Sequence, residues 1–284
     1  MGSNVLSAIM NIMSHRNSDL NEYQAKSHTR INAIGEALEQ FLCDAYAGTF
    51  TMSPIIRDQT FERTFSYLGN QNNPPDFIVK GGEAVEIKKV EGMSSKINLN
   101  SSPPKNILSI NDPRITRSCR DCESWSEKEL IYIIGSTPKG IIKSLFFIQG
   151  RCWAADEEVY EKAARNIKSA VGDWAESEKR KVQETKELGR LNRVDPLGIT
   201  DLRIRGMWHI SNPSKLYEEL IESDAHWQTS ISCLLTKALY VSYPLIDRER
   251  VEKTETMSLK NVQIKDPNNP VRKISAVLLT GGWP

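Results

Sequence analysis

Asp76, Glu86 and Lys88 are three charged residues whose types suit the hydrolysis of a phosphodiester bond. That reaction needs charge neutralised on the phosphate, an activated water and a stabilised leaving oxygen. Two carboxylates close together can hold Mg²⁺, which favours hard oxygen ligands and supplies much of this stabilisation. A nearby ammonium group can orient or deprotonate the attacking water. The three residues are therefore a candidate catalytic set, with the two carboxylates as candidate metal ligands.

Two short strands, Asp76–Lys80 and Glu83–Val90, are predicted around these residues, joined at a Gly-Gly pair. Side chains alternate between the two faces of a strand, so Glu86 and Lys88 share one face. Their apolar neighbours point to the opposite face, where they can enter the core. This pattern predicts a cleft that holds the charged pair.

The loop between these strands decides whether Asp76 joins the set. A two-residue turn at Gly81-Gly82 would pair Asp76 with Ile87, and would turn its side chain to the wrong face. A three-residue loop that includes Lys80 pairs Asp76 with Glu86 instead. The catalytic hypothesis therefore requires the longer loop or a bulge.

The short motif by itself is weak, since an Asp followed by Glu-x-Lys arises by chance roughly once in a chain of this length. The alternative is an edge strand whose charges are solvated.

A further carboxylate could come from a helix predicted to end near Gly48. Glu39 lies at the margin of its apolar stripe and could reach the site, whereas Glu36 points nearly opposite the stripe. A solvated Glu39 is the alternative there. The stripe consists of Ile31, Ile34, Leu38, Phe41, Leu42 and Ala45.

Further elements predict an α/β fold with a central mixed sheet flanked by helices. Buried strands are expected at Leu130–Gly135 and Ser144–Gly150, and a strand carrying two arginines at Leu202–Trp208. Asp156 can cap a helix whose apolar positions are Val159, Ala163, Ile167 and Val171. The last sixty residues or so have only weak signals, apart from a turn at Asp266–Pro270.

The composition is that of an ordinary globular protein, with 284 residues and a formal net charge of +1. An arm-type nucleic-acid binder would be far more basic, so any DNA contact must come from local clusters. The five cysteines are scattered and odd in number, which suits a reducing cytoplasm. No apolar run, Val5–Met13 included, reaches membrane length. We therefore expect a cytoplasmic protein without a membrane partner.

Several long blocks, over about residues 30 to 212, carry a family resemblance. They are Phe65–Asn70, Asn73–Asp76, Gly81–Lys89 (Gly81-Gly82-x-Ala84-Val85-Glu86-Ile87-Lys88-Lys89), Leu99–Lys105, Leu188–Leu197 and Leu202–Trp208. These blocks resemble NgoPII-type restriction endonucleases. The resemblance implies the PD-(D/E)XK nuclease fold, Mg²⁺, a homodimer and cleavage of double-stranded DNA at GGCC. It also implies a metal site at Asp76, Glu86 and Ile87.

From this resemblance we expect one restriction-endonuclease-like domain over residues 1–284. Its catalytic core would cover about residues 28–172, and its DNA-recognition and dimer region about residues 173–284. The activity would be type II, Mg²⁺-dependent scission of both strands leaving 5′-phosphates. A cognate methyltransferase would act on the same site without necessarily binding this chain. Three alternatives remain: a structure-specific repair or recombination nuclease of the same fold, a DNA-binding protein that does not cut, and an unrelated enzyme with a chance motif.

Two local basic clusters are candidates for DNA contact. Arginine can grip guanine O6 and N7 together, whereas phosphate contacts carry no sequence information. Arg203 and Arg205 lie two apart on a predicted strand and hence on one face. The alternative for each arginine is an ion pair or a solvated surface. The candidate residues are Ser101, Ser102, Lys105 and Arg117 in the first cluster, and Arg190, Arg193, Arg203 and Arg205 in the second.

Overall fold

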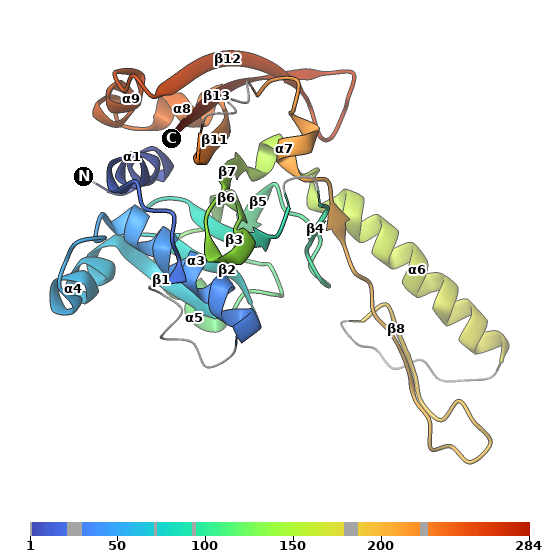
Figure 1. Cartoon of the computed structure of the whole chain (residues 1–284). Coiled ribbons are helices and arrows are strands. Elements are labelled where there is room, and N and C mark those ends of the chain that lie inside the picture. The colour runs from blue at the N-terminus through green and yellow to red at the C-terminus, as the bar shows by residue number, and fades with distance from the viewer. Residues whose placement is uncertain (1, 22–29, 71–72, 93–94, 179–186, 222–226) are drawn as a thin grey trace. The chain divides into compact units, whose positions relative to one another are not determined.

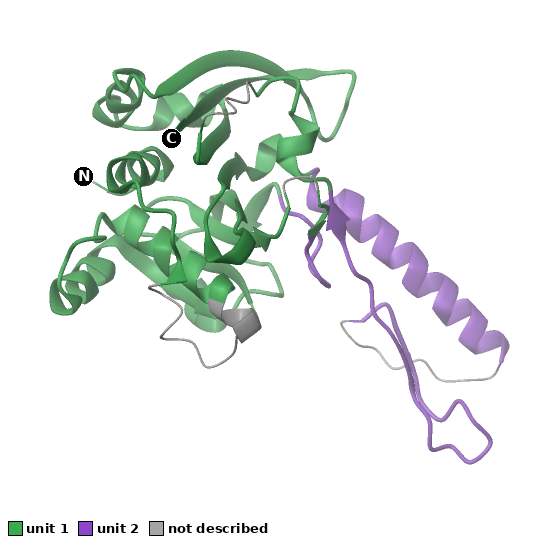
Figure 2. Cartoon of the chain, in the orientation of Figure 1, with its two compact units in different colours: residues 1–97, 106–154, 211–284 green, residues 98–105, 155–210 purple. Residues whose placement is uncertain are grey.

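The computed structural model describes residues 2–21, 30–70, 73–92, 95–178, 187–221 and 227–284 (Figure 1). The chain divides into two compact units (Figure 2). Unit 1 comprises Met1–Ile97, Asn106–Ala154 and Ser211–Pro284, and unit 2 comprises Asn98–Lys105 and Ala155–Ile210. The expected boundary near residue 172 falls inside helix α6 (Glu157–Ser177), which belongs to unit 2.

A nine-stranded mixed sheet forms the centre of unit 1 within the described residues, with strand order β1-β2-β3-β6-β7-β11-β13-β12 and β5 paired to β6. β3 runs parallel to β6, and β7 parallel to β11, while the other pairs are antiparallel. The strands are β1 Phe65–Asn70, β2 Asn73–Val79, β3 Ala84–Val90, β5 Ile107–Ser109, β6 Glu127–Ser136, β7 Ser144–Gln149, β11 Thr229–Thr236, β12 Met257–Lys265 and β13 Lys273–Trp283.

The sheet confirms the four strands predicted for unit 1, which are β2, β3, β6 and β7. It also excludes the edge-strand alternative, because β3 lies between β2 and β6. Three strands of the same sheet, β11, β12 and β13, lie in the C-terminal region, where the sequence pattern is weak. The β12–β13 connection contains the predicted turn, closed by a hydrogen bond from the Asp266 N–H to the Arg272 carbonyl.

Helices α1 (Val5–His15) and α3 (Arg30–Ala47) pack against each other and contribute to the core cluster with the central strands (Figure 1). The sequence predicted only that Val5–Met13 is too short to span a membrane. In the structure this segment belongs to α1 and is buried in the core. Full burial of a leucine, isoleucine or phenylalanine side chain stabilises a fold by about 1.5–3 kcal/mol, and Leu6, Ile9 and Leu38 are fully buried. α3 ends before Gly48 as predicted, where the backbone φ is +69°.

Shorter helices complete unit 1: α4 Pro54–Thr64, α5 Arg117–Arg120, α7 Pro213–Leu216, α8 Lys237–Ser242 and α9 Leu245–Glu252, with 3₁₀ turns at Pro138–Gly140 and Gly150–Cys152. Among the described residues, none of the helices has both the length and the apolar character needed to cross a bilayer.

Unit 2 is built on α6 and on a two-stranded ribbon, β8 (Gly189–Leu191) with β9 (Leu202–Ile204). A second pair joins β4 (Ile97–Asn98) to β10 (His209–Ile210). The strand predicted at Leu202–Trp208 is shorter in the structure, where β9 ends at Ile204. The predicted helix after Asp156 is confirmed, but its apolar stripe is not buried, since Val159 is 55% exposed. Within unit 2, β8 contacts α6, where Gly189 approaches Val171 so closely that a Cβ would lie 2.8 Å from Val171 Cγ1.

Candidate active site

The β2–β3 hairpin has the three-residue loop that the catalytic hypothesis requires. The Val79 N–H donates to the Glu83 carbonyl at 3.0 Å, which closes a loop of Lys80, Gly81 and Gly82. Phe77 pairs with Val85, and the same register sets Asp76 opposite Glu86. Gly81 has a φ of +67°, a conformation that residues with a Cβ rarely adopt. The glycine pair therefore fixes the register that brings the two carboxylates together.

Glu86 and Lys88 form an ion pair on one face of β3. The distance from Lys88 Nζ to Glu86 Oε1 is 2.5 Å, and the side chains are 25% and 14% exposed for Lys88 and Glu86 respectively. The Ile87 N–H between them donates to Asp76 Oδ2. The Ile87 side chain itself is buried in the core, as the alternation of a strand predicts. Within the described residues, the buried Glu86 Oε2 has no hydrogen-bond partner.

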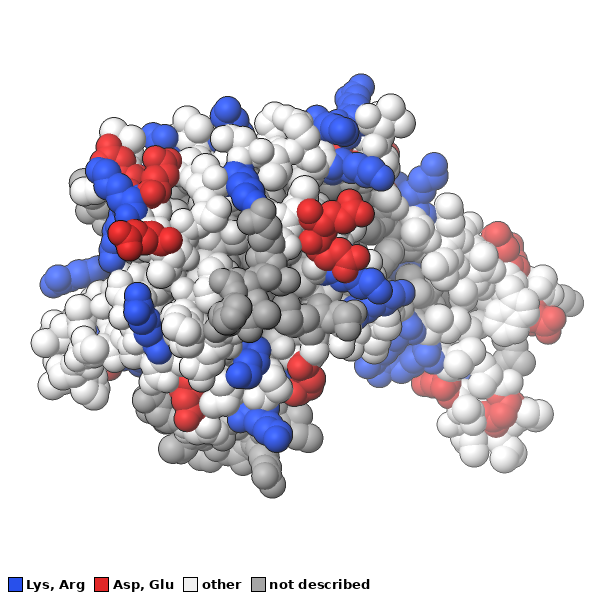
Figure 3. All heavy atoms as spheres, turned by 45° about the horizontal axis from the view of Figure 1, so that its top comes forward, with Lys and Arg blue, Asp and Glu red and all other residues white. Residues whose placement is uncertain are grey.

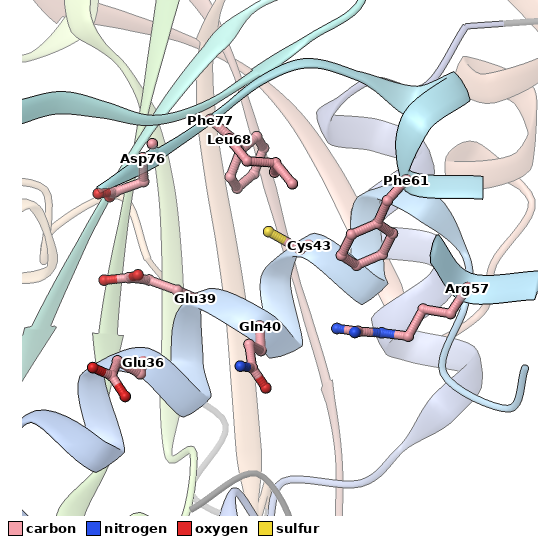
Figure 4. Close-up of a pocket in the computed structure, with 10 residues that line it drawn as sticks. Glu36, Glu39, Gln40, Cys43, Arg57, Phe61, Leu68, Asp76 and Phe77 are labelled. Atoms are coloured by element: carbon pink, nitrogen blue, oxygen red, sulfur yellow. The ribbon is translucent and has the colours of Figure 1, made fainter. Parts of the chain in front are cut away.

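A pocket of about 280 Å³ opens beside Asp76 and is lined by residues of α3, α4, β1 and β2. Figure 4 shows Glu39 extending from α3 toward Asp76 on β2. Glu36, which is expected to point nearly opposite the apolar stripe, also lines this pocket, so Glu39 is not alone in reaching it. Residues three apart lie on one side of a helix, so a pocket that follows α3 meets both. The lining residues are Glu36, Glu39, Gln40, Cys43, Arg57, Phe61, Leu68, Gly69, Asp76 and Phe77.

Arg57 and Gln40 are pocket residues that the sequence reasoning did not single out. Arg57 Nε lies 2.6 Å from Asp44 Oδ1, and its guanidinium carbon lies 4.4 Å from the centre of the Phe61 ring. Asp44 lies near the end of α3, and Arg57 lies in the first turn of α4. No local pattern marks such a contact, so only the fold could identify it.

The electrostatics of the site disfavour the ionised form of two of its carboxyl groups in the protein alone. Burial raises the pKa of Asp76 well above its usual range, Glu86 and Glu39 raise it further, and Lys88 opposes them. The pKa of Glu39 is raised by burial first, and then by Glu86 and Glu36. Burial lowers the pKa of Lys88, but Glu86 and Asp76 outweigh that effect, so its net pKa is raised and the ammonium stays protonated.

These residues fit a small, hard cation. Among the described residues there is no group of three or more His, Cys, Asp or Glu arranged to hold a metal. Mg²⁺, however, is usually held by one or two carboxylates and keeps several waters. Asp76 and Glu86 offer that smaller donor set, and the unpartnered Glu86 Oε2 is an oxygen that a cation would satisfy.

The second basic cluster lies on the β8–β9 ribbon, where Arg190 pairs with Arg203 across the strands. Arg190 Nη2 lies 3.4 Å from Asp201 Oδ2, and the Arg193 N–H donates to the same carboxylate. Arg203 and Arg205 both contact Glu187. The ion-pair alternative therefore describes the side chains of Arg190, Arg203 and Arg205 in the unbound protein, and these side chains are still 34%, 51% and 63% exposed.

The first basic cluster is divided between the units. Ser101 is exposed and Ser102 half-buried in unit 2, and Arg117 is exposed in unit 1 beside Asp121 at 3.2 Å. Lys105, by contrast, is only 7% exposed, and a buried side chain does not suit a surface phosphate contact. On the face shown in Figure 3, basic and acidic side chains of the described residues are interspersed, in keeping with the near-neutral total.

The mixed sheet flanked by helices, with clustered carboxylates and a lysine at its β2–β3 hairpin, defines a restriction-endonuclease-like fold. Comparison with known proteins agrees: the model of the NgoPII restriction endonuclease family matches residues 3–266. The type II restriction enzyme NgoPII of Neisseria gonorrhoeae is 36% identical over 278 residues, covering 98% of this chain and 99% of the relative. No solved structure matches the chain. The chain therefore belongs to the NgoPII restriction endonuclease family, which confirms the resemblance and extends it into the C-terminal strands.

Proposed function

We propose that this protein is a Mg²⁺-dependent type II restriction endonuclease that hydrolyses both strands of duplex DNA at GGCC. Family membership supports the class of enzyme. The β2–β3 register carries the assignment of the catalytic set, because it brings Asp76 opposite Glu86 with Lys88 on the face of Glu86. The GGCC site is the one that the family resemblance implies.

Asp76, Glu86 and the backbone carbonyl of Ile87 would hold the metal, since an aliphatic side chain offers no ligand. Bound Mg²⁺ would supply positive charge against the scissile phosphate and the leaving oxygen. Lys88 holds and orients the attacking water, to which its protonated ammonium can donate. Glu39 faces Asp76 across the pocket and would add a further carboxylate to the same centre.

The reaction that these roles support joins a water oxygen to phosphorus and breaks the bond to O3′. A proton lost by the water balances the one gained by the departing O3′. The products are a 5′-phosphate and a 3′-hydroxyl. Because both strands undergo the same chemistry, the reaction must occur twice at each site.

A two-fold dimer would meet that requirement. The described part of the chain has one such catalytic set, and a symmetric pair would present two of them to the antiparallel strands. The same symmetry demands a palindromic site, because each subunit must meet the same base edges. GGCC offers two guanines per half-site, which suits the exposed guanidinium groups of Arg203 and Arg205. A cognate methyltransferase would protect host DNA by modifying the same sequence.

Digestion of supercoiled plasmid with Mg²⁺, and with EDTA as the control, tests the proposal. We expect discrete fragments that require Mg²⁺. A smear, or preference for branched substrates, would favour a repair nuclease, and a mobility shift without cutting would favour a non-catalytic DNA-binding protein. Sedimentation of the protein with a GGCC duplex measures the expected dimer, and a monomer on cleaved DNA would contradict the symmetric arrangement.

A further inference from the structure

Glu187 stands beside two of the arginines that the proposed function assigns to DNA recognition. The β8–β9 register pairs Gly189 with Ile204, and the Leu188 N–H donates to the Ile204 carbonyl at 3.0 Å. This pairing carries the chain back past the end of β9 and sets Glu187 next to Arg203 and Arg205. The contact is therefore a product of the ribbon's register.

One carboxylate binds both guanidinium groups. Arg203 donates from Nε to Oε2 at 2.9 Å and from Nη2 to Oε1 at 2.6 Å, which is a two-point contact. Arg205 donates from Nε to Oε1 at 2.6 Å. Hydrogen bonds from Arg203 and Arg205 lower the pKa of Glu187 to about 2, so the carboxylate is ionised at neutral pH.

These contacts place Glu187 on the Nε side of both guanidinium groups, so that it engages only one of the two N–H groups of Arg203 Nη2. A guanidinium has five N–H donors, and Glu187 takes the Nε edge of each arginine. The edge formed by the two terminal nitrogens is the one that can meet guanine O6 and N7 end-on. The Glu187 side chain is 15% exposed, whereas those of Arg203 and Arg205 are 51% and 63% exposed. Much of each arginine side chain therefore remains open to solvent while both contact the carboxylate.

We propose that Glu187 is a positioning residue for sequence recognition: it stays paired with Arg203 and Arg205 on DNA and holds their outer edges toward guanine bases. The inference rests on the proposed role of these arginines in reading GGCC. Fixing two long side chains before binding lowers the conformational entropy lost when the specific contacts form. Random DNA offers phosphates that accept many orientations, so it gains little from this arrangement.

A competing role for the same contact makes the opposite prediction. If Glu187 only competed with DNA for the guanidinium groups, its removal would release them and tighten binding to every sequence. A general charge effect would also tighten binding to every sequence, because one negative charge near the phosphates is lost. A positioning role predicts instead that specific binding weakens even though the protein becomes more positive.

The test compares Glu187→Gln with Glu161→Gln in the full-length protein. Glu161 forms a surface ion pair with Arg165 on α6 in the same unit, so its substitution removes the same charge away from the ribbon. Fluorescence anisotropy in EDTA measures binding to a short duplex with one GGCC site and to a duplex without it. We expect Glu187→Gln to weaken GGCC binding by about tenfold, which is within the range for a lost guanine contact. Binding to the other duplex should be unchanged or tighter, and Glu161→Gln should leave the ratio of the two affinities unchanged.

Two further variants separate this inference from the proposed function. In an Arg203→Ala/Arg205→Ala background, adding Glu187→Gln should cause no further loss of GGCC affinity, because its action passes through the arginines. Unchanged or tighter GGCC binding by Glu187→Gln would overturn the positioning role. If the arginine variant itself keeps the full preference for GGCC, the proposed recognition role of Arg203 and Arg205 fails instead, and the inference fails with it.

Discussion

Carboxylates in the catalytic pocket and in the β8–β9 ribbon have pKa values shifted in opposite directions. In the pocket, burial and neighbouring carboxylates raise the pKa of Asp76 and of Glu39. In the ribbon, hydrogen bonds from two arginines lower the pKa of Glu187 to about 2. Hydrogen bonds from Thr200 are the main cause of the lowered pKa of Asp195. The pocket therefore disfavours the ionised form of its carboxyl groups when no cation is bound, while each of these ribbon acids is stabilised in its ionised form by donors nearby.

This difference separates two ways of building a functional site. The pocket residues are held by a sheet and helices whose packing can bear the cost of partly buried charge. The ribbon has little core, and its arginines depend on ion pairs for their orientation. Cleavage should therefore tolerate substitutions of surface residues away from the site. DNA recognition, in contrast, should change when a single charged residue of the ribbon is replaced.

The largest effect should come from the catalytic set. Asp76→Ala, Glu86→Ala and Lys88→Ala should each lower the cleavage rate by roughly a hundredfold or more, because each removes a metal ligand or the charge that orients water. Binding to GGCC DNA should survive, and loss of a carboxylate beside the phosphates should strengthen it. Single-turnover cleavage and anisotropy measure the two quantities separately.

Glu91→Ala is the matched control for this prediction. Lys89 and Glu91 form an ion pair with the same two-residue spacing at the end of β3, but the Glu91 side chain is 68% exposed. Its loss should leave cleavage nearly unchanged. Near-normal turnover by the Glu86 variant would remove the basis for the site assignment.

The buried carboxylate of Glu83 should make the stability of unit 1 depend on pH. Burial raises its pKa from 4.5 to about 7, although Lys128 and backbone N–H groups act in the opposite direction. The folded protein therefore binds the proton more tightly than the unfolded chain. The resulting stability is fully present below about pH 4.5 and is lost as the pH rises through about 7.

Denaturant unfolding of the wild type and Glu83→Gln at several pH values checks this prediction. Since a tenfold change in proton affinity corresponds to about 1.4 kcal/mol, the free energy of unfolding should fall by up to about 3 kcal/mol more in the wild type between pH 4.5 and 8. Two curves that run parallel over that range would show that Glu83 does not titrate in this way.

The smallest effect should come from the ribbon. Arg203→Ala or Arg205→Ala should weaken binding to the GGCC duplex by about 1–3 kcal/mol for a lost two-point guanine contact. Binding to random DNA should change much less. Arg165→Ala, on the exposed face of α6, is the control and should change neither. An equal loss on both duplexes would assign that arginine to a phosphate.

The catalytic hairpin could be predicted from sequence because its determinants are local. Strand alternation and the choice between two loop lengths led to a single register compatible with catalysis, and the structure has that register. The helix that carries Glu39 could be predicted in the same way, from the spacing of its apolar residues. These features depend on residues close together in the chain.

The parts that sequence reasoning missed depend on distant residues. The core helix α1 packs through partners on α3, and the three C-terminal strands extend a sheet begun by residues far earlier in the chain. The apolar spacing of α6 predicted the helix but not its exposure, since Val159 and Ile167 are 55% and 46% exposed. Glu187 carried no motif, because its contact with Arg203 and Arg205 follows from pairing between two strands.

The most direct measurement of the central claim is to sequence the fragment ends from plasmid digested by the wild type and by Glu86→Ala under identical Mg²⁺ conditions. We expect wild-type ends to map to GGCC on both strands and to carry 5′-phosphates, while the variant should produce no ends above background. Ends at another palindrome would contradict only the GGCC assignment. Ends scattered over unrelated sequences, or an undiminished yield from Glu86→Ala, would contradict the account of a site-specific nuclease built on this carboxylate pair.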